Sequence, residues 1–284
     1  MSATISAVVN TLDAERFLAY ALRSVASWVD EIVVVDMGST DGTVAIARRF
    51  GATVVDHPRT GFVEAARGFA CDAARGPWLL VLDADELVPP ALARRLRAVA
   101  ESDEADAVRV ARCNYLLGAP LRHSGWNPAR DVHVRFFRRG AVEFLPVLHT
   151  DPRPHPDTRV LTLGADDALA LVHLNYLDLD DVLARMGRYS NVEAAQAFAA
   201  GTRASRAAAL RGAAREWLTR FVRHGGYRDG WRGFYLAFVM AAGRVVTQAK
   251  LAELEAVGPR EAVERRYREV AEGVLAGYGN GVAS

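Results

Sequence analysis

Over the first hundred residues, short apolar runs rich in β-branched side chains alternate with longer segments in which apolar residues recur at helical spacing. The runs are too short for helices and have the length of buried strands. Strands that alternate with helices form a parallel sheet with right-handed crossovers, because a parallel neighbour is reached only through a crossover connection. The sequence therefore predicts an α/β domain built on buried strands. The expected strands cover residues 5–9, 32–35, 53–55 and 78–82, and the expected helices cover residues 14–26, 43–50 and 62–74, the second helix being capped by side chains of Ser39, Thr40 and Asp41.

Polar residues follow these apolar runs. Asn10 and Thr11 follow the first run, Asp36 follows the second, and Asp83 follows the fourth. Ligands of open α/β sheets bind at the carboxyl ends of the strands, so we expect a binding site where these residues meet. No G-x-G-x-x-G motif follows the first run, and the chain contains no G-x-x-x-x-G-K-[ST] loop. This pattern argues against a dinucleotide-dependent oxidoreductase and against a P-loop enzyme.

The tripeptide Asp83-Ala84-Asp85 places two carboxylates two residues apart, directly beyond an apolar run. Once the chain leaves the pleat of the strand, both side chains can turn toward the same cleft. Carboxylate oxygens are hard ligands that suit Mg²⁺ or Mn²⁺, and a metal held there can neutralise a diphosphate. Isolated D-x-D pairs are frequent at strand ends, but the preceding strand and Asp36 on a neighbouring strand favour a metal site here.

Composition is that of a globular chain. The 284 residues are 51% hydrophobic and 24% charged, with a net charge of +1, which suits one large domain or a domain with an extension. Cys71 and Cys113 are too few for a disulfide framework and have no C-x-x-C spacing. The N-terminus lacks the features of a signal peptide, and no apolar run reaches the roughly 18 residues of a membrane span. We therefore expect a cytoplasmic protein that does not cross a bilayer.

Residues 201–250 are strongly basic, because nine arginines and Lys250 are balanced only by Glu216 and Asp229. Aromatic and apolar residues are interleaved with these charges. Such a segment suits peripheral contact with the anionic inner face of a membrane, a grip on a phosphorylated acceptor, or the ordinary packing of an amphipathic helical pair. No nucleic-acid partner is expected.

The stretches that follow the strands, with several later ones, resemble glycosyltransferase family 2 of the GT-A fold, and within it the lipopolysaccharide-core glucosyltransferase-like branch. The resemblance covers most of the chain. It implies a Rossmann-like α/β domain, with a mostly parallel sheet flanked by helices, over residues 1–195, divided into a nucleotide-sugar half (1–106) and an acceptor half (107–195) with strands at 105–110 and 133–137. A helical, basic C-terminal extension over residues 196–284 follows. The superfamily stretches are Asn10-Thr11 with Glu15, 30–36 with 38–43, and 78–86, and those that indicate the branch are 114–118, 122–128, 135–137, His149, His173 and 226–234.

The same resemblance implies a nucleotide-diphosphate sugar as donor substrate and a divalent metal, Mg²⁺ or Mn²⁺, as cofactor. Asp83 resembles a ribose contact or a water-mediated metal residue, and Asp85 resembles the direct metal ligand. His173 resembles a late histidine that completes the metal coordination, although a histidine in an apolar stretch is also typical of a hydrogen-bonded core residue. The expected metal ligands are thus Asp83, Asp85 and His173, and the expected donor-site residues are Thr11, Asp13, Glu15, Asp36, Ser39, Arg67, Asp83, Ala84 and Asp85.

The implied reaction is an inverting displacement, in which an acceptor hydroxyl attacks the anomeric carbon of a hexose, such as glucose from UDP-glucose. The metal stabilises charge on the leaving diphosphate, and a carboxylate takes the hydroxyl proton. The branch usually carries a His-Glu pair where this chain has His149-Thr150-Asp151. The base is therefore expected to be Asp151, with Asp131 and Glu143 as alternatives.

Two departures from the family pattern lie near the expected donor pocket. Asp13 and Gly68 each stand where an asparagine is common, so the donor sugar and the nucleotide base stay open. The acceptor stays open as well, and a carbohydrate, a lipid-linked saccharide or another small molecule is possible. His123, Trp126 and Trp231 are candidates for the acceptor side, because aromatic faces stack on sugars, and packing roles for the tryptophans are equally compatible with the sequence.

Other functions fit less well. A phosphohydrolase of the haloacid dehalogenase type also carries D-x-D at a strand end, with the first aspartate as nucleophile, but on its first strand, whereas Asp83 follows the fourth. A sugar-nucleotide nucleotidyltransferase needs a Gly-rich, basic loop after the first strand, where this chain has residues 10–13. A catalytically inactive sugar-nucleotide-binding module is a further alternative, and the intact pair Asp83 and Asp85 argues against it.

Overall fold

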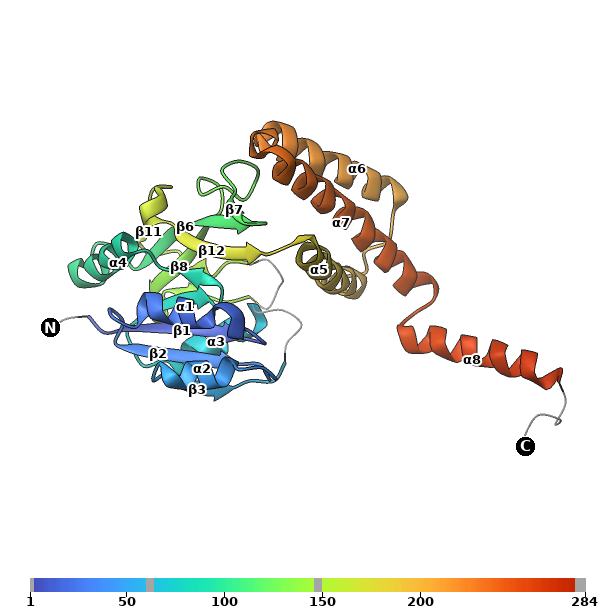
Figure 1. The fold of residues 1–284 in the computed structure, drawn as a ribbon, viewed down its shortest axis with the longest axis horizontal. Coiled ribbons are helices and arrows are strands. Elements are labelled where there is room, and N and C mark those ends of the chain that lie inside the picture. Colours follow the sequence, from blue (N-terminus) through green and yellow to red (C-terminus); the bar gives the residue numbers. More distant parts are fainter. Residues whose placement is uncertain (1–2, 60–63, 146–149, 279–284) are drawn as a thin grey trace. The chain divides into compact units, whose positions relative to one another are not determined.

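The computed structural model describes residues 3–59, 64–145 and 150–278. Its first part is an α/β fold built on a sheet with parallel and antiparallel strands. The strands are β1 (Ile5–Thr11), β2 (Glu31–Asp36), β3 (Thr53–Asp56), β4 (Trp78–Asp83), β5 (Glu86–Leu87), β6 (Ala107–Leu116), β7 (Ala119–Pro120), β8 (Val132–Arg138), β9 (Val142–Glu143), β10 (Arg153–Pro154), β11 (Val160–Thr162) and β12 (Leu171–Tyr176). The order along the main sheet is β3-β2-β1-β4-β8-β6-β12-β5. Figure 1 labels β3, β2, β1, β8, β6 and β12 of this series.

Most pairs in this sheet are parallel. The four strands from β3 to β4 run parallel to one another, and β6 is parallel to both β11 and β12. Strand β8 is antiparallel to its neighbours β4 and β6, and β5 is antiparallel to β12. The expected α/β fold with a mostly parallel sheet is confirmed, and so are the strands expected near residues 105–110 and 133–137.

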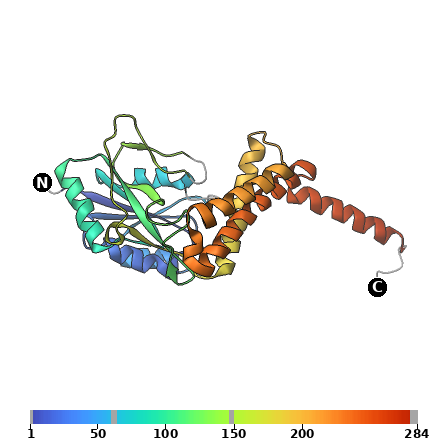
Figure 2. The ribbon, with the colours of Figure 1, turned by 90° about the horizontal axis from the view of Figure 1, so that it is seen from above.

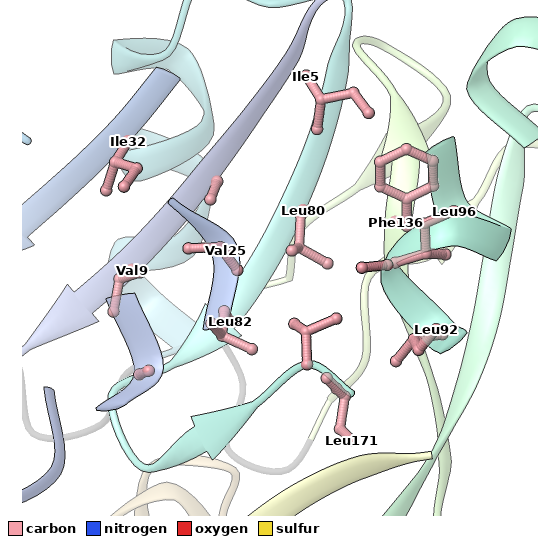
Figure 3. Packing of buried hydrophobic residues seen from close by; sticks show 14 of the residues in the cluster. Ile5, Val9, Val25, Ile32, Leu80, Leu82, Leu92, Leu96, Phe136 and Leu171 are labelled. Carbon is pink, nitrogen blue, oxygen red and sulfur yellow. The ribbon is translucent and has the colours of Figure 1, made fainter. Parts of the chain in front are cut away.

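Helices cover both faces of the sheet, because the strands alternate between two buried faces. The helices of this part are α1 (Glu15–Val25), α2 (Thr43–Arg49), α3 (Glu64–Ala73) and α4 (Pro90–Ser102). On one face, α1, α2 and α4 pack against residues such as Ile5, Leu80 and Phe136, which Figure 3 shows converging on one cluster. On the other face, α3 packs against Val8 and Val33, so the strands lie between α1 and α3 (Figure 2).

Two local expectations were wrong. Strand β3 is not buried: its residues are half-buried or exposed, because among the described strands β3 pairs with β2 alone and forms the edge of the sheet. Ser39 and Thr40 do not cap α2; their side chains bond to Asp36 and Asp13 instead. Asp41 alone reaches the first turn, where its carboxylate accepts from the backbone N–H of Thr43 at 3.0 Å. The expected helix over 62–74 begins at Glu64 in the described residues.

The C-terminal part is helical, as expected. Its helices are α5 (Leu179–Ala199), α6 (Arg206–Trp217), α7 (Gly230–Ala256) and α8 (Arg260–Ala276). Chain contacts divide the protein into two compact units, Met1–Val182 with Thr219–Tyr235, and Leu183–Leu218 with Leu236–Ser284. The domain boundary expected at residue 195 stays a prediction. Helix α5 passes through that residue without a break.

Within the second unit, α7 is held to α5 and α6 by polar contacts. Lys250 Nζ donates to the carbonyl of Gly187 and to Ser190 Oγ, both at 2.7 Å. Arg244 pairs with Glu216 on α6 at 3.3 Å. None of the described helices is long and apolar enough to cross a membrane.

Candidate active site

The polar residues that follow the strands meet at one edge of the sheet. The register of the parallel strands aligns Asn10 with Asp83 and Thr11 with Asp36. Thr11 Oγ1 donates to Asp36 Oδ1 at 3.0 Å. The expected convergence of strand ends is therefore present, because parallel strands place their carboxyl ends on one side of the sheet.

Asp36 organises the loop that follows β2. Its carboxylate accepts from the backbone N–H groups of Gly38 and Ser39 at 3.1 and 2.9 Å, and from Ser39 Oγ at 2.6 Å. Gly38 has a φ of +84°, a conformation that glycine adopts without strain. With the bond from Thr11, Asp36 accepts four hydrogen bonds inside the protein, so it shapes the rim of the site. The contact expected between Asp36 and the nucleotide stays a prediction.

Asp13 and Glu15 join the loops after β1 and β2. Asp13 has a φ of 48°, and its Oδ1 accepts from the backbone N–H of Thr40 at 2.7 Å. Aspartate and asparagine both tolerate this left-handed conformation, which explains why either residue suits the position. Glu15 Oε2 accepts from the backbone N–H of Gly42 at 2.7 Å, and the N–H of Asp13 donates to Ser39 Oγ at 2.8 Å. In these contacts, Asp13, Glu15 and Ser39 stabilise the rim.

Asp83 is held by two arginines. Arg67 Nη2 donates to Oδ1 at 2.9 Å, and Arg135 Nη2 donates to Oδ2 at 3.1 Å. Burial alone would raise the pKa of Asp83, but the charges of Arg135 and Arg67 hold it well below its ordinary value. Arg135 also donates to Glu86 Oε1 at 2.9 Å, and its Nε and Nη1 have no hydrogen-bond partner among the described residues. Each oxygen of Asp83 thus accepts one hydrogen bond from a guanidinium group, and the expected role of Asp83 as a metal ligand stays a prediction.

Asp85 and His173 are brought together by the pairing of β5 with β12. His173 lies opposite Glu86 in that antiparallel pair, and the backbone N–H of Leu174 donates to the carbonyl of Asp85 at 2.9 Å. The side chains then approach each other, with His173 Nε2 3.5 Å from Asp85 Oδ1. His173 is buried, and Asp85 is partly open to solvent.

The orientation of the His173 ring follows from Asn114. The amide nitrogen of Asn114 donates to Asp131 Oδ2 at 2.6 Å and to the carbonyl of Trp126 at 2.9 Å, so its oxygen faces His173 Nδ1 at 2.6 Å. Nδ1 must therefore carry a proton. In the neutral ring, Nε2 then carries a lone pair that points at the carboxylate of Asp85. Both groups are hydrogen-bond acceptors, so a cation bound between them would make their approach favourable.

These residues fit a divalent metal of the kind that completes its coordination with substrate. Mg²⁺ is usually bound by one or two protein ligands together with water and phosphate oxygens. No group of three or more His, Cys, Asp or Glu side chains close enough to hold a metal exists in the described ranges. Asp85 and His173 would thus supply two ligands and leave the other positions to water and a bound diphosphate.

The candidate bases Asp131 and Asp151 are joined by a histidine. His133 Nδ1 lies 2.6 Å from Asp151 Oδ1, and its Nε2 lies 2.7 Å from Asp131 Oδ1. Asp131 is buried and also accepts from Arg112 Nε and Nη2 at 3.0 and 3.1 Å, and from Asn114. All the acceptor positions of Asp131 are thus occupied. Asp151 is 45% exposed and is the more accessible of the two.

The remaining expected residues have simpler positions. Glu143 lies in β9 opposite Arg153, and no described hydrogen bond or ion pair connects it with Asp131 or Asp151. Ala84 packs against the hydrophobic core below the D-x-D. His149 lies outside the described residues.

Several residues of this cluster carried no role in the sequence interpretation. One of them, Glu86, lies on β5, and the other four lie on β6 and β8, which pair antiparallel with each other and carry polar residues at alternate positions. The pattern runs through position 131, directly before β8, through 133 and 135 on β8, and through 112 and 114 on β6, which is the signal of a polar strand face inside a protein. The residues are Glu86, Arg112, Asn114, His133 and Arg135.

Known proteins resemble this chain in sequence. The sequence model of glycosyl transferase family 2 matches residues 6–153. The lipopolysaccharide core biosynthesis glycosyltransferase LpsC of Rhizobium meliloti (strain 1021) is 27% identical over 266 residues, which are 92% of this chain and 96% of that protein. An uncharacterized glycosyltransferase of Rickettsia bellii (strain RML369-C) is 25% identical over 259 residues, 88% of this chain and 86% of that protein.

Solved structures also resemble it. The structure of S. aureus TarS 1–349 covers 90% of this chain and 92% of its own, with a TM-score of 0.46 and 15% identity. A glucosyl-3-phosphoglycerate synthase from Mycobacterium tuberculosis, in complex with Mn²⁺, UDP-glucose and phosphoglyceric acid, is 26% identical over 40% of this chain and 44% of its own, with a TM-score of 0.32. Because the family match extends over more than half of the chain and follows the strand-end motifs described above, the protein belongs to glycosyl transferase family 2 and is a glycosyltransferase that uses a nucleotide-sugar donor.

Proposed function

We propose that this enzyme transfers a hexose, with inversion, from a UDP-sugar such as UDP-glucose to an acceptor hydroxyl, with Mg²⁺ or Mn²⁺ held by Asp85 and His173. The observation that carries the metal assignment is the 3.5 Å approach of His173 Nε2 to Asp85 Oδ1, with the ring fixed through Asn114. When bound, the metal would stabilise the charge of the leaving diphosphate. UDP is the nucleotide expected from the branch that the sequence resembles.

The neighbouring residues have distinct proposed roles. Asp83 keeps Arg67 and Arg135 in place beside the donor site, since both of its oxygens are bound by these arginines. Spare N–H groups of Arg67 and Arg135 favour an anionic ligand at this edge. Asp151, partly exposed and close to this cluster, takes the proton of the acceptor hydroxyl. Thr11 and the loops ordered by Asp13, Glu15, Asp36 and Ser39 form the nucleotide side.

The acceptor that we propose is a saccharide of the lipopolysaccharide-core type. Support comes from the likeness to LpsC, which extends over 92% of the chain. Transfer to purified core oligosaccharide, detected by mass increase, tests the choice. Hydrolysis of the donor without transfer would favour a different acceptor.

Contact with an anionic membrane surface at the inner face would suit a lipid-linked acceptor. The segment 219–235 exposes several apolar and aromatic side chains beside basic ones, a combination that favours an anionic interface. Cosedimentation with phosphatidylglycerol vesicles, and its loss in Trp231→Ser, would support this contact, whereas equal recovery with and without vesicles would exclude it. The exposed residues are Val222, Arg223, Tyr227, Arg228, Trp231, Phe234 and Tyr235.

The donor site can be tested without knowing the acceptor. Calorimetric titration of UDP, with and without Mn²⁺, is expected to show metal-enhanced binding in the parent and none of this enhancement in Asp85→Ala or His173→Ala. Asp72→Ala provides the matched control, because Asp72 is an exposed aspartate on α3. Absence of binding by UDP, and then by GDP and dTDP, would refute the proposed donor class. Binding that is equal with and without Mn²⁺ would refute the metal assignment alone.

A further inference from the structure

His133 bridges the two carboxylates that sequence reasoning offered as alternative bases. Its two ring nitrogens lie 2.6 Å from Asp151 and 2.7 Å from Asp131. Ionised carboxylates only accept hydrogen bonds, so both nitrogens must donate for both contacts to be favourable. The bridge therefore requires a protonated, positively charged ring.

The charges around His133 favour this state. Arg112 and Arg135 oppose a further positive charge, and Asp131 and Asp151 favour it. Burial alone would lower the pKa of His133, but its hydrogen bonds to Asp131 and Asp151 raise the pKa above its ordinary value. Burial alone would raise the pKa of Asp151, but the hydrogen bond and the charge of His133 lower it, more than the charges of Arg135 and Arg67 do.

The two ends of the bridge differ. Asp131 is buried and accepts four hydrogen bonds, two from Arg112, one from Asn114 and one from His133. Asp151 is half-exposed, and its Oδ2 has no hydrogen-bond partner among the described residues. Asp131 thus anchors the ring, while Asp151 keeps one oxygen free to accept a proton.

We propose that His133 is a positioning residue, which Asp131 anchors and which holds Asp151 as the base through Oδ1. This inference rests on the proposed function. In the transfer step, the acceptor oxygen forms a bond to the anomeric carbon, and the bond from that carbon to the diphosphate oxygen breaks, with its electron pair leaving on the nucleoside diphosphate. The hydroxyl proton passes to Asp151 Oδ2, and His133 keeps both of its own protons.

Two substitutions separate the ends of the bridge. In His133→Asn, the amide nitrogen can take the place of Nδ1 and keep the donor to Asp151. In His133→Gln, the longer amide can take the place of Nε2 and keep the donor to Asp131. If His133 acts through Asp151, the asparagine variant retains more activity, whereas a role limited to anchoring the strand predicts the reverse order. His155→Gln is the matched control, since His155 is an exposed histidine.

The assay measures UDP released from UDP-glucose in the presence of Mn²⁺, with water as acceptor. We expect His133→Gln to lower kcat by about 100-fold with little change in KM, which is the lower end of what a general base contributes. His133→Asn is expected to lower kcat by about tenfold or less. Because His133 lowers the pKa of Asp151 against the effect of burial, the acidic limb of the pH profile of kcat is expected to move to higher pH in His133→Gln.

A second variant distinguishes a loss of catalysis from a folding defect. Asp151→Ala changes an exposed side chain, and adding His133→Gln to it is expected to cause no further loss, because residues that act as one unit are not additive. An equal or reversed order of the two histidine variants, an unmoved acidic limb, or additive losses would overturn the inference. A parent that binds no UDP would instead refute the proposed function, and the inference with it.

Discussion

Replacing Arg135 by methionine is expected to destabilise the first unit, because the arginine holds two carboxylates inside the protein. Arg135 is 3% exposed, and its Nη2 donates to Asp83 at 3.1 Å and to Glu86, which is fully buried, at 2.9 Å. Methionine retains bulk but provides neither donors nor charge. Removing one partner of a buried ion pair costs about 3–5 kcal/mol, and since Arg67 and Arg112 stay close to the carboxylates we expect a loss of about 3 kcal/mol.

The dependence of this loss on pH identifies its cause. The pKa of Asp83 is lowered in the folded parent, so its stabilising contribution is fully present above the unfolded pKa of about 3.9 and is lost as pH falls through the folded pKa. Without Arg135, burial raises the folded pKa of Asp83 and penalises its charged form. The difference in unfolding free energy between parent and variant should therefore be larger at pH 7 than at pH 4.

Urea unfolding followed by tryptophan fluorescence measures this difference, because Trp78 is buried in the same sheet. Arg75→Met is the matched control. Arg75 is 84% exposed and pairs with Glu31 at 2.8 Å, and an ion pair whose cation lies in solvent contributes about 1 kcal/mol or less. If Arg135→Met costs no more than Arg75→Met, or if its cost is the same at pH 4 and pH 7, the assignment of a buried ion-pair cluster is wrong.

Three further predictions follow from other contacts. Asn114→Leu removes the amide that fixes the ring of His173. In calorimetry, we expect binding of UDP in the presence of Mn²⁺ to weaken by about 10- to 100-fold, while binding without metal is unchanged. An equal enhancement of binding by Mn²⁺ in parent and variant would contradict the ring assignment. Gly233→Ala places a Cβ 1.8 Å from the backbone oxygen of Gly226 and should cost about 1–3 kcal/mol in urea unfolding. The Cβ in Gly42→Ala meets Glu15 Oε2 at 2.8 Å, at the far end of a side chain that can turn away with the loss of one exposed hydrogen bond, and should cost less. The reverse order would show that the α7 backbone yields easily. The raised pKa of His133 stabilises the folded protein below about pH 6.5, the unfolded pKa, and this contribution is lost as pH rises through the folded pKa. The melting temperature of the parent should therefore fall from about pH 6 toward alkaline pH, and that of His133→Gln should fall less. Identical pH dependence in both proteins would refute the charged bridge.

Local sequence patterns were sufficient to predict the α/β fold. Apolar runs of strand length alternate with helical segments, and parallel strands necessarily align their carboxyl ends, so Thr11, Asp36 and Asp83 could be placed at one edge without a structure. The approach of His173 to Asp85 was expected from the family resemblance. The catalytic roles of Asp151 and Asp131, and the metal itself, stay predictions.

The edge strand and the loop contacts show where local patterns fail. Strand β3 has the β-branched composition of a buried strand, but its burial depends on whether a second neighbour exists in the sheet. Ser39 and Thr40 have the side chains of helix caps, but Ser39 donates to Asp36 at the end of β2 and Thr40 donates to Asp13 in the loop after β1. The burial of β3 and the contact of Thr40 with Asp13 therefore depend on residues that are distant in sequence.

The contacts of the polar cluster around Asp83 and His133 depend on tertiary structure alone. Alternation along β8 indicates that His133 and Arg135 share a face, yet it does not say which side chains that face meets. Pairing of β8 with β4 and β6, and of β12 with β6 and β5, brings Asp83 and Glu86 to Arg135 and Asn114 to Asp131. A period in the sequence fixes the direction of a side chain relative to its own strand, whereas a hydrogen bond or ion pair between strands requires the register that only the folded sheet provides.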